Sequence, residues 1–325
     1  MEFFNPNSNV NFMGIRRFTV AVAVALFLVS VVSLSTKGLN LALDFTGGTL
    51  TEVTFNEAVE QKAVTGALEA AGMRGSQVQR FDSQSFSIRL SPETVSRIVE
   101  GEVTEESSID DNNARVAAAL KQALETDGRS VTLKPSVYVG PQVGAELLYN
   151  GIVAVLVVLT GIVIYIALRF EWKFAVATIA GEIHDVVVTL GFFSLLGLDF
   201  DLTVLAAILA VDGYSVNDKI VVFDRVRELF RSSRKAPPVE ILNTAVNQTL
   251  SRTIMTSVTT LLTVVALYLF GGESLQGFSL ALIVGIVVGT LSSIFFASPV
   301  LLALGVSKQD LMPKAREEGE LARRP

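Results

Sequence analysis

The chain has 325 residues, of which 50% are hydrophobic, and its mean hydropathy is +0.51. Soluble domains keep a charged surface, so this apolar excess predicts a protein embedded in lipid. The formal net charge of -6 indicates little, because the charges are sorted by location. The chain has no cysteine, which excludes disulfides and thiolate chemistry, and its one histidine, His184, excludes a histidine-rich metal site.

Several apolar runs reach the length of about 20 residues that a helix needs to cross a bilayer. The first run covers about Phe18–Leu34 and follows Arg16 and Arg17. It is too long for a signal-peptide core, and no convincing cleavage site follows it, so we expect a retained span. Five further spans are predicted at Ala145–Leu168, Phe174–Leu196, Leu202–Phe223, Thr253–Phe270 and Leu280–Leu304. The fold class predicted is therefore a polytopic α-helical membrane protein with six transmembrane helices.

About 105 residues of soluble composition separate the first two spans. Period-2 and helical patterns alternate there in the order β-α-β-β-α-β, which is typical of a ferredoxin-like α+β domain. The predicted elements are strand Thr49–Phe55, helix Ala58–Ala71, strands Gln77–Phe81 and Ser85–Leu90, helix Asp111–Thr126 and strand Ser130–Val139. The acidic stretch Glu100–Asp111 is interpreted as a solvated loop.

Basic residues predict the orientation, because connections rich in Lys and Arg stay in the cytoplasm. They precede span one, join spans two and three, and follow spans four and six, whereas the connections Gly197–Asp201 and Gly271–Gly277 have none. Both termini are therefore expected in the cytoplasm and the soluble domain outside. The predicted organisation is residues 1–37 for the N-terminus and first helix, 38–143 for the outer domain, 144–306 for helices two to six, and 307–325 for a cytoplasmic tail.

Spans three, four and five carry ionisable side chains at membrane depth, where such groups are costly unless they are paired, hydrated or functional. In span three, Thr178, Glu182, Asp185 and Thr189 fall on one helical stripe. A similar stripe of span five contains Arg252, Thr256, Thr259 and Thr263. Polar groups surround most of span four, between Asp212 and Lys219, so we expect that helix inside the bundle.

Asp218 is the strongest functional candidate in these spans. It lies about five residues inside the cytoplasmic end of span four, and Arg252 lies near the cytoplasmic end of span five, so the two are expected at a similar depth. Burial favours a neutral carboxyl group and a nearby cation favours the carboxylate, so such a pair can bind and release a proton.

The other polar residues have structural interpretations. Serines and threonines can bond to backbone carbonyls, and His184 is interpreted as a packed, hydrogen-bonded residue that points to a different face from Asp185. In span six, small residues recur four apart and predict a close-packing face that we expect to take part in binding a partner. They are Ala281, Gly285, Gly289, Ser293 and Ala297.

Four segments of the chain resemble motifs of one known family. They are Asp44–Gly48 (DFTGG), His184–Val188 (HDVVV), Gly213–Asp218 with Val221–Glu228 (GYSVND…VVFDRVRE), and Ser251–Ser257 (SRTIMTS). Any one would be weak, but the four occur in order within a match from about Asn11 to Leu304. The chain therefore resembles the SecD/SecF family of protein-export membrane proteins, within the resistance-nodulation-division superfamily.

The resemblance implies a subunit of the bacterial cytoplasmic (inner) membrane that pairs with SecD and cooperates with the SecYEG translocon. It would help unfolded preproteins to cross the membrane with the proton motive force, and protons would be the coupling ion with no other cofactor. Asp218 would be the proton-responsive carboxylate, Arg252 its partner, and Asp185 part of the same core. Supporting polar roles fall to Asp212, Ser215, Asn217, Lys219, Glu182, His184 and Thr256.

Four residues depart from the family pattern. Ala42 stands where glycine usually precedes the DFTGG motif, and Asp212, Lys219 and Glu182 add charges to the spans. Asp212 and Lys219 lie two helical turns apart, too far for direct contact, so we expect their partners on other helices.

Other functions were weighed against these residues. A small-molecule or lipid exporter of the same superfamily would need a larger outer domain. An intramembrane aspartyl protease needs a GxGD motif, whereas this chain has Asp212-Gly213-Tyr214-Ser215. A passive scaffold would tolerate neutral substitution of Asp218. No phosphate-binding GxxxxGK[ST] loop is present, and neither enzymatic activity, a metal site nor a nucleic-acid partner is expected.

Overall fold

The computed structural model describes residues 10–99, 109–125, 130–233 and 236–311. The chain divides into two compact units, one of residues 41–153 and one of residues 1–40 and 154–325. We call them the sheet unit and the helical unit. The predicted acidic loop Glu100–Asp111 lies mostly outside the described residues.

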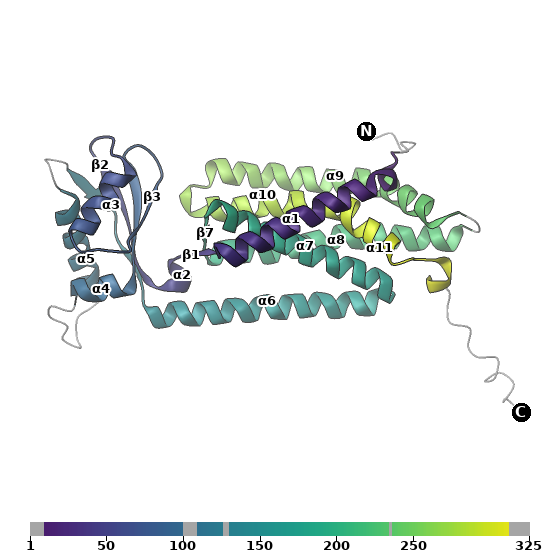
Figure 1. The fold of residues 1–325 in the computed structure, drawn as a ribbon, viewed down its shortest axis with the longest axis horizontal. Coiled ribbons are helices and arrows are strands. Elements are labelled where there is room, and N and C mark those ends of the chain that lie inside the picture. Colours follow the sequence, from purple (N-terminus) through teal and green to yellow (C-terminus); the bar gives the residue numbers. More distant parts are fainter. Residues whose placement is uncertain (1–9, 100–108, 126–129, 234–235, 312–325) are drawn as a thin grey trace, which may run out of the picture. The chain divides into compact units, whose positions relative to one another are not determined.

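The sheet unit is an antiparallel sheet covered by helices (Figure 1). Its strands are β2 (Gly48–Phe55), β3 (Gln77–Arg80), β4 (Ser85–Leu90), β5 (Val131–Leu133) and β6 (Val137–Val139). They lie in the order β3-β4-β2-β5, and β6 also pairs with β2. Its helices are α2 (Leu43–Thr46), α3 (Gln61–Ala70), α4 (Pro92–Val99) and α5 (Ile109–Leu124). Alternate residues of β2 point inward, and Phe55 packs edge-on to Phe86 in a core that Leu68 of α3 and Leu120 of α5 complete.

Two elements of this unit differ from the sequence prediction. The single strand expected at Ser130–Val139 is broken into β5 and β6, because Pro135 between them has no amide proton to donate to a ladder. Both pieces pair with β2, at different ends, and the Oγ of Ser136 in the break lies 2.8 Å from Thr51 Oγ1. The helix α4 was not predicted.

The DFTGG segment forms the turn that enters β2. Asp44, Phe45 and Thr46 lie in the one-turn helix α2, and Gly48 has a φ of 116°. A Cβ at Gly48 would lie 2.2 Å from the carbonyl oxygen of Leu90, so only glycine fits. Ala42, the departure from the family pattern, has a φ of -74° that any residue adopts, so this turn does not require glycine there.

The helical unit contains the long helices α1 (Arg16–Thr36), α6 (Pro141–Arg169, which starts in the sheet unit), α7 (Trp172–Leu196), α8 (Leu202–Ser232), α9 (Pro238–Phe270) and α10 (Glu273–Ser292). All of them except α6 make extensive contacts with one another (Figure 1). Shorter elements are η1 (Phe12–Ile15), the π-helical turn η2 (Ser293–Ala297), α11 (Ser298–Ala303), η3 (Lys308–Leu311) and the two-residue strands β1 (Asn40–Leu41, which ends in the sheet unit) and β7 (Asp199–Phe200).

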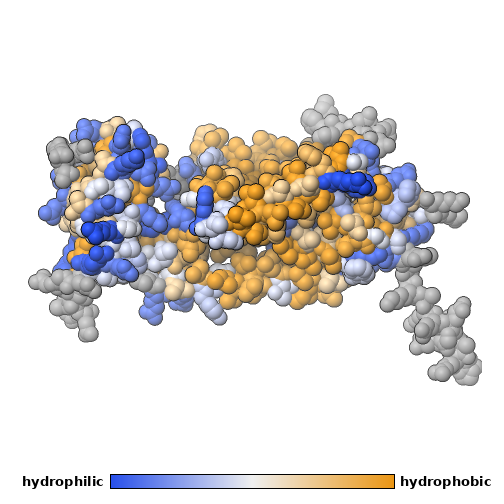
Figure 2. Space-filling model, viewed as in Figure 1, coloured by the Kyte–Doolittle hydropathy of each residue, from blue (hydrophilic) through white to orange (hydrophobic). Residues whose placement is uncertain are grey.

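Five helices in the described part of the chain are long and apolar enough to cross a membrane. Figure 2 shows their apolar side chains as a broad orange surface over the helical unit. The sixth predicted span, α8, has 31 residues, carries Asp212, Asp218 and Lys219 along its middle, and is not among these five helices. Instead it is in contact with α7, α9 and α10, as its polar pattern predicted.

The small residues of span six pack inside the chain. A Cβ at Gly285 would lie 2.4 Å from Val211 Cγ1, and one at Gly289 would lie 2.5 Å from Ser215 Oγ. The close-packing face is therefore confirmed, but its expected role in binding a partner is wrong, because α8 already occupies it.

The end of span six bends through the turn η2 at Pro299. Proline has no amide proton, so the carbonyl of Phe295 one turn earlier loses its helical donor. Thr19 of α1 donates to that carbonyl at 3.1 Å, and Ser298 Oγ donates to the carbonyl of Ser293 at 2.9 Å. The break in the helix thus holds α1 against span six.

Candidate functional site

The interface between α7 and α8 buries a cluster of charged side chains. On α7 the predicted stripe of Thr178, Glu182, Asp185 and Thr189 is buried throughout. On α8 the buried polar side chains are Asp212, Ser215, Asp218 and Lys219. Residues three and four apart share a helix face, so Asp212, Ser215 and Lys219 form a row that faces the α7 stripe.

Lys219 is the centre of this cluster and is 0% exposed. Its Nζ donates to Glu182 Oε1 at 2.6 Å, to Asp185 Oδ2 at 2.7 Å and to Ser215 Oγ at 2.7 Å. All three donors of the ammonium group are therefore used, as a buried charge requires. The expectation that Lys219 finds its partners on another helix is confirmed for the two carboxylates.

Gly181 makes the space that Lys219 occupies. A Cβ there would lie 2.5 Å from Lys219 Cε. Because Gly181 has no side chain, the side chain of Lys219 can lie against the backbone of α7. The sequence analysis did not identify this glycine, although its position beside an unexpected intramembrane glutamate was a usable signal.

Asp185 and His184 are joined, contrary to the expectation that they point to different faces. His184 Nδ1 lies 2.9 Å from Asp185 Oδ1, and Nε2 lies 3.2 Å from the carbonyl oxygen of Ala23 on α1. The imidazole also stacks on Phe296 with a centroid separation of 4.7 Å. His184 is thus a packed, hydrogen-bonded residue as predicted, and it fixes the orientation of the Asp185 carboxylate, which also accepts from Ser215 at 2.7 Å.

Asp218, the leading candidate, is 4% exposed, and its Oδ2 has no hydrogen-bond donor among the described residues. Lys219 and, from α9, Arg252 act on Asp218 electrostatically, and neither donates to that oxygen. Arg252 is an exposed residue. Asp218 and Arg252 therefore interact electrostatically, with the carboxyl group of Asp218 inside the bundle and Arg252 at its surface.

The remaining predicted residues lie on the open faces of α8 and α9. Asn217 is exposed, and Thr256 is half-buried with its hydroxyl donating to the carbonyl of Arg252 at 3.1 Å. Thr259 and Thr263 bond to carbonyls of the preceding turn in the same way, as expected for threonines in apolar helices.

Two carboxyl groups, those of Glu182 and Asp212, lie close together beside Lys219. Glu182 and Asp212 are 2% and 3% exposed, and their carboxyl groups lie within reach of each other. Glu182 Oε2 and both carboxyl oxygens of Asp212 have no donor in the described residues. In those residues no group of three or more His, Cys, Asp or Glu side chains is arranged to hold a metal ion.

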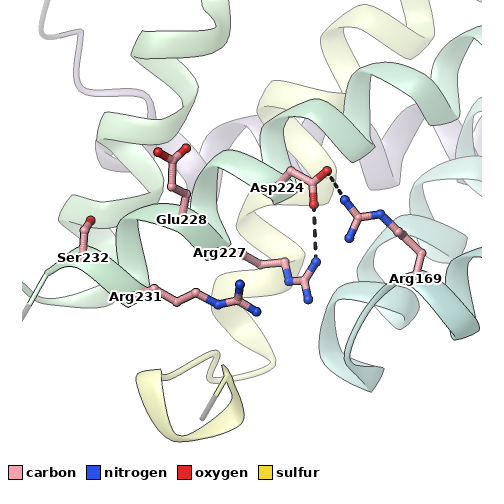
Figure 3. A pocket seen from close by; sticks show the side chains of 6 residues that line it. All are labelled: Arg169, Asp224, Arg227, Glu228, Arg231 and Ser232. Carbon is pink, nitrogen blue, oxygen red and sulfur yellow. Dashed lines mark hydrogen bonds and ion pairs between the residues drawn. The ribbon is translucent and has the colours of Figure 1, made fainter. Parts of the chain in front are cut away.

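The DRVRE segment at the end of α8 forms a separate charged cleft, shown in Figure 3. Asp224 accepts from Arg169 of α6 at 2.6 Å and from Arg227 at 3.4 Å. Arg227 also pairs with Glu171 at 3.0 Å, in the connection from α6 to α7. These ion pairs fasten the end of α8 to the turn between α6 and α7, a role that sequence analysis did not identify.

Long apolar helices around a buried ammonium group and buried carboxylates define an integral membrane protein with a charged interior. Residues 119–307 match the family described as protein export membrane protein SecD/SecF, C-terminal, and residues 32–59 match the SecD/SecF GG motif. The chain therefore belongs to the SecD/SecF family.

Relatives of known name agree over almost the whole chain. The chain is 46% identical to protein translocase subunit SecF of Pseudomonas aeruginosa over 94% of both chains. It is 41% identical to the same subunit of Vibrio alginolyticus over 98% of this chain and 96% of the relative.

Solved structures agree as well. The crystal structure of SecDF, a translocon-associated membrane protein from Thermus thermophilus, superposes with a TM-score of 0.79 at 37% identity. That match covers 93% of this chain and 40% of the SecDF chain. The super-membrane-facing form of SecDF gives a TM-score of 0.65 at 36% identity, over 98% of this chain and 40% of the other.

Proposed function

We propose that this protein is the SecF subunit of a SecDF complex and assists Sec-dependent protein translocation with the proton motive force. The observation that carries the proposal is Asp218, a buried carboxyl group with an unsatisfied oxygen and an arginine acting on it from the next helix. The family supports the same conclusion, because its named relatives are translocase subunits.

Asp218 is proposed as the group that binds and releases the coupling proton. Protonation removes the negative charge that attracts Arg252, so it weakens the electrostatic tie between α8 and α9. The shift of these helices would be passed to the outer domain, which would pull or hold an emerging polypeptide. Asp185, held by Lys219, Ser215 and His184, keeps α7 and α8 in register during this change.

The topology proposed is six transmembrane helices with α8 as the fourth, packed against α7, α9 and α10 and open on the face that carries Gly213 and Asn217. The sheet order β3-β4-β2-β5 supports a ferredoxin-like outer domain, because it is the order that a β-α-β-β-α-β chain gives in that fold. Val10 is bonded to Asn247 near the start of α9, and Lys308 to Ser233 at the end of α8. Val10 and Lys308 thus lie on the arginine-rich side of the bundle, which supports two cytoplasmic termini in a bacterial inner membrane.

The partners proposed are SecD, the SecYEG translocon, a translocating preprotein and the surrounding lipid. The protein is proposed to act without enzymatic chemistry and with protons as its coupling ion. The face of α8 that carries Gly213 and Asn217 is exposed and belongs to the GYSVND segment, so we assign the SecD contact there.

Complementation tests the function. A bacterial strain depleted of its own SecF should accumulate unprocessed preprotein, and expression of this chain together with its own SecD should restore export. Pulse-labelling of a secreted protein measures the ratio of precursor to mature form. Restored resistance to small toxic compounds without restored export would favour an exporter of small molecules and overturn the proposal.

A leucine at Gly213 tests the partner-binding face. Gly213 is exposed and a Cβ there meets no atom within 4 Å, so the side chain of Gly213→Leu starts outside the packed face of α8. Copurification with SecD should fall, whereas the control Gly66→Leu, with equally open space on α3, should leave it unchanged. Unchanged copurification of Gly213→Leu would remove this face from the interface.

A further inference from the structure

The contact between Glu182 and Asp212 is unlike the other charged contacts of the bundle, because neither partner carries a positive charge. Their carboxyl groups lie within reach of each other across the α7–α8 interface, and both side chains are almost wholly buried. Of the four carboxyl oxygens in this pair, Lys219 donates only to Glu182 Oε1. Glu182 Oε2 and both oxygens of Asp212 have no donor in the described residues.

An ionised carboxylate can only accept hydrogen bonds, so two ionised carboxylates cannot bond to each other. They also repel each other, and in a buried site this repulsion keeps one of two adjacent carboxyl groups protonated. A single proton supplies the missing donor and turns the repulsive contact into a hydrogen bond between the two groups.

We propose that Glu182 and Asp212 together bind one proton, shared between Glu182 Oε2 and the Asp212 carboxyl group, and form a proton-binding site separate from Asp218. This proton-binding site does not depend on the proposed role in export.

The charge of the surrounding residues agrees with one bound proton. Glu182, Asp185 and Asp212 face a single ammonium group, that of Lys219, so three carboxylates would leave two negative charges unbalanced. One proton reduces this excess to one, and His184 is bonded to Asp185 on the far side of that carboxylate.

The neighbouring helices supply no other cation that could replace the proton. The packed helix α10 has no titratable side chain after its first residue, and α1 has none after Arg17. From α9, Arg252 acts on Asp218.

Lys219 connects the two proposed proton sites. It is bonded to Glu182, and it also acts electrostatically on Asp218, its neighbour in sequence. Loss of the proton from the Glu182–Asp212 pair would therefore add a negative charge beside the ammonium group that Asp218 senses. Occupancy of one site is thus expected to change proton binding at the other.

Infrared difference spectroscopy tests the pair directly, because a protonated carboxyl group has a C=O stretch that carboxylates lack. The full-length chain would be reconstituted in phospholipid vesicles, and spectra recorded in H₂O and D₂O in sodium-free buffer at neutral pH. We expect one protonated carboxyl band that disappears in Glu182→Gln and equally in Asp212→Asn, because either amide can donate to the remaining carboxylate. Glu240→Gln, at an exposed glutamate of α9, and Asp218→Asn should both retain it.

Any of the following four results of the infrared experiment would overturn the proposal. A wild-type spectrum without a protonated carboxyl band means that no proton is shared, and this needs no variant to fold. A band retained in either single variant means that the two groups do not share a proton. A band that disappears when sodium is added means that a metal cation occupies the site. Loss of the band in Asp218→Asn together with its retention in Glu182→Gln and Asp212→Asn would assign it to Asp218 instead.

Discussion

Removal of the Lys219 ammonium group should destabilise the protein strongly. Lys219→Met keeps most of the side-chain volume but deletes three buried hydrogen bonds, two of them to carboxylates. Truncation of one partner of a buried ion pair costs about 3–5 kcal/mol, because the remaining charge stays buried without compensation. With roughly 1.4 kcal/mol per tenfold change, the folded-to-unfolded ratio should fall by more than about a hundredfold.

Reversible unfolding in mixed micelles measures this loss as the free energy of unfolding. Lys37→Met is the matched control, because Lys37 is an exposed lysine of the same unit and its removal should change that free energy by less than about 1 kcal/mol. The triple variant Lys219→Met, Glu182→Gln, Asp185→Asn should recover part of the loss, since the two carboxylates that bond to Lys219 are then no longer left buried without their cation. A Lys219→Met variant as stable as the control would refute the central position given to this lysine.

Three further outcomes follow from the packing and the charges. Gly181→Ala should lower the free energy of unfolding by about 1–3 kcal/mol, because the new Cβ would lie 2.5 Å from Lys219 Cε and three hydrogen bonds hold that lysine in place. A free energy of unfolding equal to that of the wild type would show that the lysine moves freely. Gly285→Leu should reduce the yield of folded protein through its collision with Val211, and normal thermal stability in detergent would contradict the internal packing face. In the sheet unit, amide hydrogen bonds from Gln84 and Ser85 hold the pKa of the Asp82 carboxyl group below 3.8. These hydrogen bonds therefore stabilise the turn above pH 3.8, and that stabilisation is lost as the pH falls through the lowered pKa. In an NMR titration the amide resonances of Gln84 and Ser85 should shift with a midpoint below pH 3.8. A midpoint above pH 3.8 would be inconsistent with these bonds.

Local patterns predicted the sheet unit where side chains alternate cleanly. Ser85–Leu90 forms a strand at the predicted bounds because its inward residues all reach the core. Ser130–Val139 was predicted as one strand because the alternation on either side of Pro135 hid the missing donor. The helix Pro92–Val99 was missed although Ser91 precedes a Pro-Glu pair, and its Oγ accepts from the amide of Thr94 at 3.3 Å, as a helix N-cap does.

The charged site was predictable only as a set of candidates. Helical spacing places Glu182 and Asp185 on one face and Asp212 and Lys219 on another, and the structure brings these faces together. The rotation of α7 against α8 decides which carboxylate meets which, and it depends on close contacts that a one-dimensional pattern does not contain. For the same reason the stripe containing Gly285 predicted close packing but not the helix against which it packs.

The proton-dependent stage of export tests the account most directly. A membrane potential of about 100 mV supplies roughly 2.3 kcal/mol per charge, enough to bias a two-state movement by about fiftyfold. Export of a secreted protein into sealed vesicles would be measured with and without a proton gradient. For Asp218→Asn, which keeps the shape of the side chain but carries no proton, we expect a folded, SecD-bound protein with no stimulation by the gradient. Full stimulation of Asp218→Asn would contradict the account and leave Asp218 a structural residue.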